Sequence, residues 1–283
     1  MIIWIASYPK SGNTLVRAML SSLLFSKDGN FNINDLQYMS NYPESYHFEG
    51  ITNKLSRIDD IKKFWTISQD KINKNNKINF LKTHHLRCGI NNYTFTNSKN
   101  TLATIYIVRD PRDVIISFSK HYNISLEKAK EAMFDHQAMI QLEKGKNPNM
   151  DSDLAIRTLL GSWSDHYNSW TKNNKNLLFL KYENLIKNKK IELLKIIKFI
   201  NNYIKINVNE SKLENCINST AFENMKKQEE NGLFNENSFY DDGKKIKFFN
   251  SGKEGNWKNV LSKEILLGIE KKFEREMKEL EYI

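Results

Sequence analysis

The sequence predicts an α/β fold in which helices flank a central parallel sheet. Short apolar runs alternate with stretches of helical periodicity, and this order favours parallel strands joined by helices on both faces. The 283 residues are enough to bury a full core, and no linker or repeat interrupts them. We therefore expect residues 1–283 to form one domain.

The chain opens with a predicted strand, loop and helix. Ile2–Ser7 is an apolar run that ends in small and turn residues, as buried strands often do. Residues 8–13 are rich in turn formers, and helical periodicity begins at Thr14. Residues 27–79 are polar with weak periodicity, so we expect only short helices and part of a binding wall there.

Two further strands and a helix follow. Ile78–Thr83 and Leu102–Val108 are apolar runs, the second rich in β-forming residues. Asp110 is a good N-cap and Pro111 suits the first helical position, so a helix is expected from there through Phe118.

The second half predicts a fourth strand, Leu177–Leu180, between helices, and a long loop, Gln228–Asn256, before a last helix. The apolar faces expected for the three helices are Ile156, Leu159, Leu160, Trp163, Tyr167 and Trp170; Ile191, Leu194, Ile197 and Ile200; and Ile265, Leu266, Ile269, Phe273 and Met277.

Composition narrows the classes of partner. The formal net charge is +10, but most basic residues are lysines spread along the chain, so we predict no nucleic-acid partner. Such a field would still attract a small anion. Two distant cysteines, no apolar run near the roughly 20 residues of a membrane span, and no secretory signal predict a reduced, cytoplasmic protein.

Unusual polar residues follow each of the first three strands, where parallel sheets bind ligands. Tyr8–Thr14 combines Lys10 and two hydroxyls with backbone N–H groups at a helix start, which favours an anion cradle. It is not a Walker A loop, because Lys10 precedes Gly12. Arg109 and Ser117 add a cation and a hydroxyl after the third strand.

The second strand ends in Lys82-Thr83-His84-His85. Alternation along a strand places Lys82 and His84 on one side and their neighbours on the other. His84 could then take a proton while Lys82 stabilises a leaving oxygen. Adjacent histidines diverge, so no metal site is predicted. Arg112 and Asp113 are interpreted as a structural cap network with Asp110, and the remaining histidines, His47, His121, His136 and His166, as structural.

Taken in order, six blocks resemble the cytosolic sulfotransferase family. They span residues 7–259 and are Ser7–Thr14, Phe80–His84, Val108–Ser117, Tyr182–Leu185, Thr220–Lys226 and Gly252–Asn259. The resemblance implies transfer of a sulfuryl group from 3′-phosphoadenosine 5′-phosphosulfate (PAPS), as co-substrate and without a metal, to a hydroxyl or amine of a small molecule.

The resemblance also implies residue roles. His84 would be the general base, with Lys82 and Lys10 stabilising the transferring group. The residues implied to bind the donor are Lys10, Ser11, Gly12, Asn13 and Thr14 at the 5′-phosphosulfate; Arg109 and Ser117 at the 3′-phosphate; Tyr182, Thr220 and Phe222 around the adenine; and Ser251, Gly252 and Lys253 in a loop that closes over the 3′-phosphate.

Three departures from the family pattern affect this site. Leu15 replaces a tryptophan that stacks on adenine, which would leave more of that contact to Phe222. Asn250-Ser251 replaces Arg-Lys, and His85-Leu86 replaces Leu-Pro.

Two other functional classes fit these residues less well. A P-loop nucleotide kinase or NTPase would need a Gly-Lys-Ser/Thr ending to the first loop, which this sequence lacks, and a carboxylate for Mg²⁺, which is not evident. A non-enzymatic basic binding module would leave Lys82 and His84 unexplained. The acceptor's identity and the oligomeric state, a homodimer included, stay open.

Overall fold

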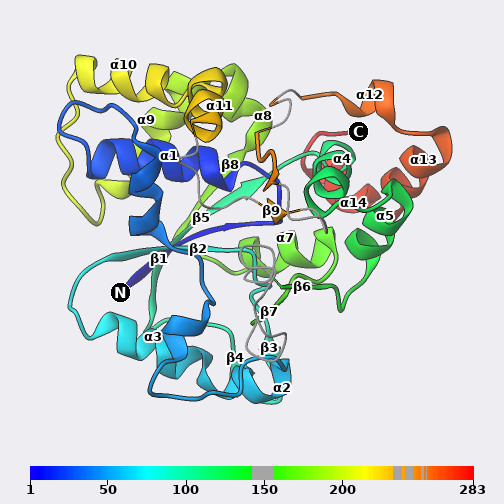
Figure 1. Cartoon of the computed structure of the whole chain (residues 1–283), viewed down its shortest axis with the longest axis horizontal. Coiled ribbons are helices and arrows are strands. Elements are labelled where there is room, and N and C mark those ends of the chain that lie inside the picture. The colour runs from blue at the N-terminus through cyan, green and yellow to red at the C-terminus, as the bar shows by residue number, and fades with distance from the viewer. Residues whose placement is uncertain (142–155, 232–237, 240–244, 250–251, 253) are drawn as a thin grey trace.

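A four-stranded parallel sheet lies at the centre of the protein (Figure 1). In this computed structural model, residues 1–283 are described except 142–155, 232–237, 240–244, 250–251 and 253. The strand order is β2 (Asn79–Thr83), β1 (Ile2–Ser7), β5 (Thr101–Val108) and β8 (Leu177–Lys181). All three strand pairs are parallel, which confirms the predicted fold class.

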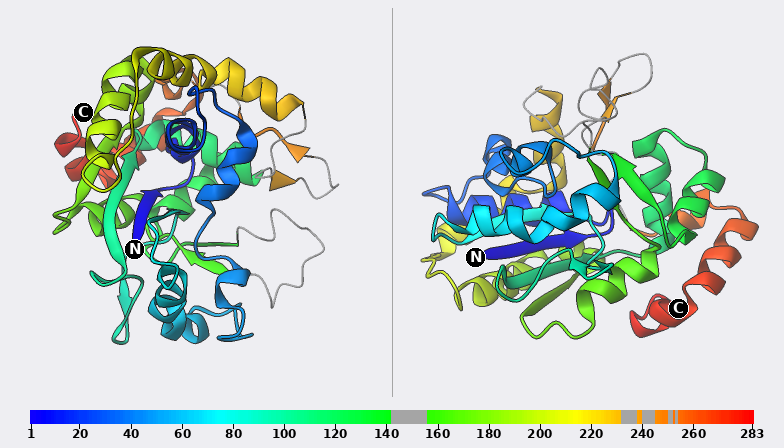
Figure 2. Two further views of the ribbon diagram at one scale, coloured as in Figure 1. Left: turned by 90° about the vertical axis from the view of Figure 1, so that its left-hand side faces the viewer. Right: turned by 90° about the horizontal axis from the view of Figure 1, so that it is seen from below.

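Strand β1 is buried along its whole length, and its side chains alternate between two cores. Ile3 and Ile5 pack with α1 (Asn13–Leu24), α9 (Lys189–Ile200) and α10 (Glu210–Ser219). Trp4 and Ala6 pack on the opposite face with α4 (Pro111–Tyr122), α7 (Trp163–Thr171), α13 (Lys263–Lys272) and α14 (Glu274–Glu279). The sheet is therefore the middle of three layers (Figure 2).

Shorter elements complete the described chain. They are η1 (Ile33–Met39), η2 (Ser45–Phe48), α2 (Ile58–Ile61), η3 (Lys62–Phe64), α3 (Trp65–Asn73), α5 (Leu126–Phe134), α8 (Tyr182–Lys187), α11 (Phe222–Glu230) and α12 (Trp257–Val260), with two-stranded pairings β3 (Gly89–Ile90) with β4 (Tyr93–Thr94), β6 (Met139–Gln141) with β7 (Arg157–Leu159), and β9 (Ser238–Phe239) with β10 (Lys245–Ile246). The short helices expected within residues 27–79 are confirmed. In the described part of the chain, no helix is both long and apolar enough to cross a bilayer.

The four predicted strands are confirmed to within one residue at each end. The helix expected from Asp110 is also confirmed, because the Asp110 side chain accepts the N–H of Arg112 and Pro111 is the first helical residue. Apolar β-formers and local capping carry these assignments, and neither depends on distant residues.

The helical face predicted from Ile156 to Trp170 is wrong in its first part. Residues 157–159 form strand β7, and helix α7 begins only at Trp163. Gly161, at φ 63°, interrupts the chain between them, and Ser162 then caps α7 by accepting the N–H of Asp165. A left-handed residue followed by a good N-cap ends one element and starts another.

The helix predicted from Ile191, Leu194, Ile197 and Ile200 is confirmed as α9, but only the last two of these residues pack on the core. Ile191 and Leu194 are 56% and 47% exposed, whereas Leu193, Ile196 and Ile200 are fully buried against the sheet. Apolar residues occupy so many positions of this helix that two faces satisfy helical spacing, and packing selects one.

The late loop and the last helix differ in detail from prediction. Helix α11 extends to Glu230, and β9 pairs with β10 inside the expected loop. The C-terminal helix is split into α13 and α14 at Phe273, whose φ of −112° breaks helical geometry. Phe273 is itself fully buried.

The same glycine-to-alanine change should have opposite effects at two positions. Gly161→Ala should lower the free energy of unfolding by about 1 kcal/mol, because a residue with a Cβ would have to keep the positive φ of this position. Gly268→Ala, within α13 and with no atom closer than 3.8 Å to the added carbon, should raise it by about 0.5–1 kcal/mol. Urea unfolding measures both. Equal effects would contradict the local account of β7 and α7.

Candidate functional site

The ends of β2 and β5 both hydrogen-bond to the loop that follows β1. The His84 Nδ1–H donates to the Ser7 carbonyl at 2.7 Å, and Arg109 Nη1 donates to the Lys10 carbonyl at 3.2 Å. Because Ser7 and Lys10 are three residues apart, the three predicted motifs lie at one edge of the sheet. The bond to Ser7 places the ring proton on Nδ1 and leaves Nε2 as the basic nitrogen of His84.

The loop itself is held in an unusual conformation. Lys10 has φ 65° and Gly12, the N-cap of α1, has φ 102°. A Cβ at Gly12 would lie 2.5 Å from Cδ2 of Tyr182, so only glycine lets the loop pass this ring. The Ser11 hydroxyl is fully buried and has no hydrogen-bond partner among the described residues. A buried hydroxyl at a helix start suits an anionic ligand.

The other predicted loop residues have different surroundings. Asn13 Nδ2 donates to the Ile5 carbonyl at 2.9 Å and to Ser7 Oγ at 3.2 Å, so its side chain braces β1. Its backbone N–H remains at the start of α1, as does that of the buried Thr14. The Lys10 ammonium lies 3.6 Å from the centre of the Phe248 ring, an arrangement that stabilises the cation.

The four residues at the end of β2 and just after it are all buried. Lys82 and His84 are 8% and 7% exposed, whereas Thr83 and His85 are fully buried. His85 stacks on Phe95 with ring centres 4.2 Å apart, and burial lowers its pKa to about 4. His84 and His85 therefore lie in different environments, the first at the site and the second in the core.

His166 contacts the site although its sequence context indicates a structural histidine. Its Nε2–H donates to the backbone carbonyl of His84 at 3.1 Å, and its Nδ1 accepts the Tyr106 hydroxyl at 2.9 Å. Burial lowers its pKa to about 3, so it stays neutral at ordinary pH. The contact joins α7 to the end of β2 across 82 residues, and no local pattern in the sequence reveals it.

Arg109 lies against the residue that follows β8. Its guanidinium is 4.3 Å from the Tyr182 ring centre, and the Tyr182 hydroxyl donates to the Gly252 carbonyl at 3.2 Å. The Phe222 ring lies directly against Gly252 and packs in one cluster with Leu15. These residues of the predicted adenine and 3′-phosphate sites are thus neighbours.

The remaining residues predicted to bind the donor are Thr220, Ser117, Ser251 and Lys253. The Thr220 hydroxyl donates to the Cys216 carbonyl at 2.6 Å, at the C-terminal end of α10. Ser117, on α4, is half-buried. Ser251 and Lys253 lie outside the described residues. Within the described ranges, no group of three His, Cys, Asp or Glu side chains is arranged to hold a metal ion.

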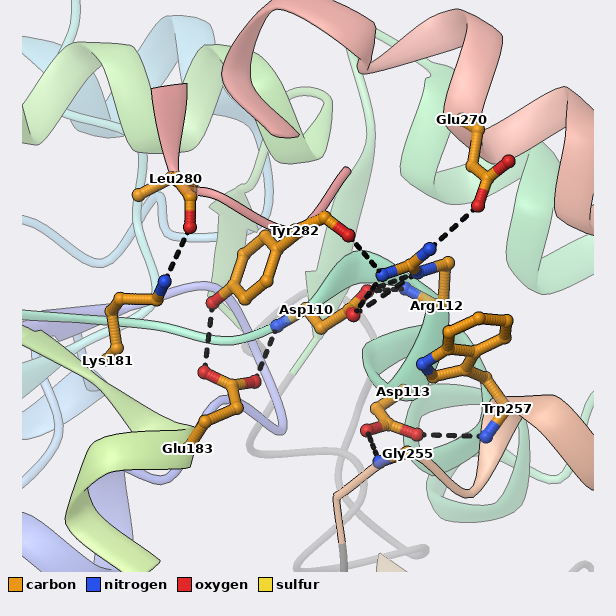
Figure 3. Close-up of polar contacts among 10 residues, drawn as sticks. All are labelled: Asp110, Arg112, Asp113, Lys181, Glu183, Gly255, Trp257, Glu270, Leu280 and Tyr282. Atoms are coloured by element: carbon orange, nitrogen blue, oxygen red, sulfur yellow. Dashed lines mark hydrogen bonds and ion pairs between the residues drawn. The ribbon is translucent and has the colours of Figure 1, made fainter. Parts of the chain in front are cut away.

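The interpretation of Arg112 and Asp113 as one cap network is only partly right. Arg112 pairs with Asp110 at 2.8 Å and with Glu270 at 2.7 Å (Figure 3). Asp113 instead accepts backbone N–H groups from Gly255 at 2.6 Å and Trp257 at 3.1 Å. The pairing sends Asp113 to a segment 142 residues away, so helix spacing alone could not predict it.

The C-terminal segment braces the same edge of the sheet (Figure 3). Glu183, beside Tyr182, accepts the Asp110 N–H at 3.0 Å and the Tyr282 hydroxyl at 3.0 Å. The Tyr282 carbonyl also accepts Arg112 Nη2 at 2.8 Å. These bonds join the ends of β5 and β8 through one carboxylate.

The carboxyl ends of the parallel strands bring together the Lys10 loop, Arg109 and His84. An α/β protein with this arrangement can bind an anion beside a base. A family model described as the sulfotransferase domain matches residues 2–281, and the chain belongs to that family. It is therefore a transferase, as the sequence resemblance predicted.

Two curated relatives and one solved structure are also sulfotransferases. The chain is 29% identical to sulfotransferase 1B1 of Canis lupus familiaris, over 92% of this chain and 78% of the relative. It is 25% identical to an amine sulfotransferase of Oryctolagus cuniculus, over 98% of this chain and 81% of the relative. A mouse sulfotransferase solved in complex with PAP (adenosine 3′,5′-bisphosphate) has a similar fold. Its TM-score is 0.56 at 22% identity, over 97% of this chain and 83% of that one.

Buried neutral histidines should make the protein less stable in mild acid. The pKa of His166 is about 3 when folded, against roughly 6.5 in an unfolded chain. Between these values the unfolded chain binds more protons, so the free energy of unfolding falls as the pH drops below about 6.5, by up to about 1.4 kcal/mol per pH unit for each such histidine.

Urea unfolding between pH 7 and 5 measures this slope. His166→Gln should make it shallower by about one proton, because glutamine does not titrate. His136→Gln is the control for loss of an exposed histidine, whose side chain is 68% exposed and pairs with Asp165. An unchanged slope in His166→Gln would show that folding does not lower the pKa of His166.

Proposed function

We propose that this protein transfers a sulfuryl group from PAPS to a hydroxyl or amine of a small molecule. The observation that carries the proposal is the convergence of His84 and Arg109 on carbonyls of one loop, at Ser7 and Lys10. A base, a cationic loop and an arginine are thereby held together, as a doubly anionic donor beside an acceptor requires. The solved relative in complex with PAP supports the same donor class.

The donor's two anionic ends match two parts of the site. The Lys10–Thr14 loop, with its buried Ser11 hydroxyl and the N–H groups at the start of α1, would hold the 5′-phosphosulfate. Arg109, with Ser117 and the Gly252 segment, would hold the 3′-phosphate. Phe222, Tyr182 and Thr220 are left for the adenine, with Leu15 beside Phe222.

His84 would act as the general base. Its Nδ1–H is engaged by Ser7, so Nε2 can accept the proton of the acceptor's hydroxyl or amine. As that proton moves to Nε2, the acceptor atom forms a bond to sulfur, and the bond from sulfur to the 5′-phosphate oxygen breaks. The products are a sulfated acceptor and adenosine 3′,5′-bisphosphate (PAP).

Two lysines would stabilise the charge that shifts during transfer. Lys82 is near the end of β2, two residues before His84, and Lys10 lies in the loop after β1. Negative charge accumulates on the leaving phosphate oxygen, and fixed cations stabilise it most when water is excluded. Lys10 rests on the Phe248 ring in this structure, so the ammonium must exchange that contact for the donor.

Donor binding is tested by thermal unfolding. PAP should raise the melting temperature well above the shift given by ATP with Mg²⁺, since a ligand at 100 times its Kd adds about 2.7 kcal/mol of stability. A larger shift with ATP and Mg²⁺ would contradict the proposal and support a nucleotide kinase.

The base is tested by His84→Gln. Transfer of sulfur-35 label from PAPS to a panel of phenols, alcohols and amines should fall by about 10²–10⁴-fold, because proton transfer contributes that much. PAP binding should be retained. His136→Gln serves as the matched control at an exposed histidine and should keep full activity. Native turnover in His84→Gln would reject this assignment.

A further inference from the structure

The carboxylate of Asp113 is directed away from its own helix. It lies in the first turn of α4, where acidic side chains usually interact with the helix N-terminus. Asp110 already caps that helix by accepting the Arg112 N–H. Asp113 is 2% exposed, and its two oxygens accept the N–H groups of Gly255 and Trp257 at 2.6 and 3.1 Å (Figure 3).

Asp113 holds Gly255 and Trp257, and Gly252, which precedes them in the chain, is also fixed. The Gly252 carbonyl accepts the Tyr182 hydroxyl at 3.2 Å, and the Tyr182 ring lies on Arg109. These residues are therefore held by α4 at one end and by the residue after β8 at the other. Arg109 is near both anchors, since it lies on the Tyr182 ring and interacts electrostatically with Asp113.

A second contact of α4 supports the same geometry. The Arg112 guanidinium lies 4.0 Å from the centre of the Trp257 indole, and Asp110 and Glu270 fix its position. Two consecutive residues of one helical turn thus hold one short segment, one by its backbone and one by its ring. Arg109 also favours the ionised form of Asp113, although burial raises the pKa of that carboxyl overall.

We propose that Asp113 is a positioning residue that holds the backbone of Gly255–Trp257 near Arg109, so that this segment and Arg109 can both bind the 3′-phosphate of the donor. This inference rests on the proposed function. Each carboxylate oxygen of Asp113 accepts one of these N–H groups, whereas an asparagine would place an NH2 donor against one of them. Asp113 then contributes to recognition of the 3′-phosphate without touching the ligand.

The proposal predicts a selective loss. Asp113→Asn should weaken binding of PAP about tenfold, the typical effect of losing a hydrogen bond to a charged group. Adenosine 5′-monophosphate, which has no 3′-phosphate, should bind about as well as before, because the Lys10 loop is untouched. The ratio of the two Kd values therefore reports on Asp113, and general loosening of the fold would not change it.

Isothermal titration of PAP and of adenosine 5′-monophosphate measures this ratio in the intact chain. Lys187→Gln is the matched control: it removes an exposed ion pair from Lys187 to Glu254 at 2.7 Å and should leave the ratio unchanged. Amide hydrogen exchange of residues 254–260, without ligand, should speed up in Asp113→Asn and stay unchanged in Lys187→Gln.

Asp113→Ser is measured in parallel as a second neutral variant. An unchanged ratio, equal weakening of both ligands, or loss of both in the two variants would overturn the proposal for Asp113. A wild-type protein that binds PAP no better than adenosine 5′-monophosphate would instead contradict the proposed function, so the two failures are distinguishable.

Discussion

The arrangement of the site depends on two carbonyl groups, one at the last residue of β1 and one in the loop that follows it. Ser7 and Lys10 each accept a hydrogen bond from the end of a neighbouring strand, at 2.7 Å from His84 and 3.2 Å from Arg109. Parallel strands bring their carboxyl ends to one edge, but they do not fix the side chains there. These two bonds join a base and an arginine to the loop, and they also set the tautomer of His84.

Several buried polar side chains around this edge form hydrogen bonds with backbone atoms. His166 binds the carbonyl of His84, Asn13 binds that of Ile5, and Glu183 binds the N–H of Asp110. A loop exposes backbone groups that a sheet or helix would satisfy, so side chains from distant elements must satisfy them. These bonds restrain the backbone of the site, although most of its functional residues lie outside regular strands.

Helix α4 connects the sheet to the later part of the chain. Its first turn holds the backbone of Gly255 and Trp257 through Asp113 and the Trp257 ring through Arg112, while the C-terminal segment reaches Arg112 and Glu183 through Tyr282 (Figure 3). Segments separated by more than 140 residues therefore meet beside Arg109.

Local chemistry in the sequence determined the strands, the cap at Asp110 and the polar residues after each strand, because apolar runs and capping residues act over a few positions. The tertiary structure alone decided which face of α9 is buried, since both faces are apolar. It also decided that residues 157–159 join a strand, that His166 holds His84, and that Asp113 reaches Gly255. These outcomes require partners far along the chain, and only packing specifies which distant groups meet.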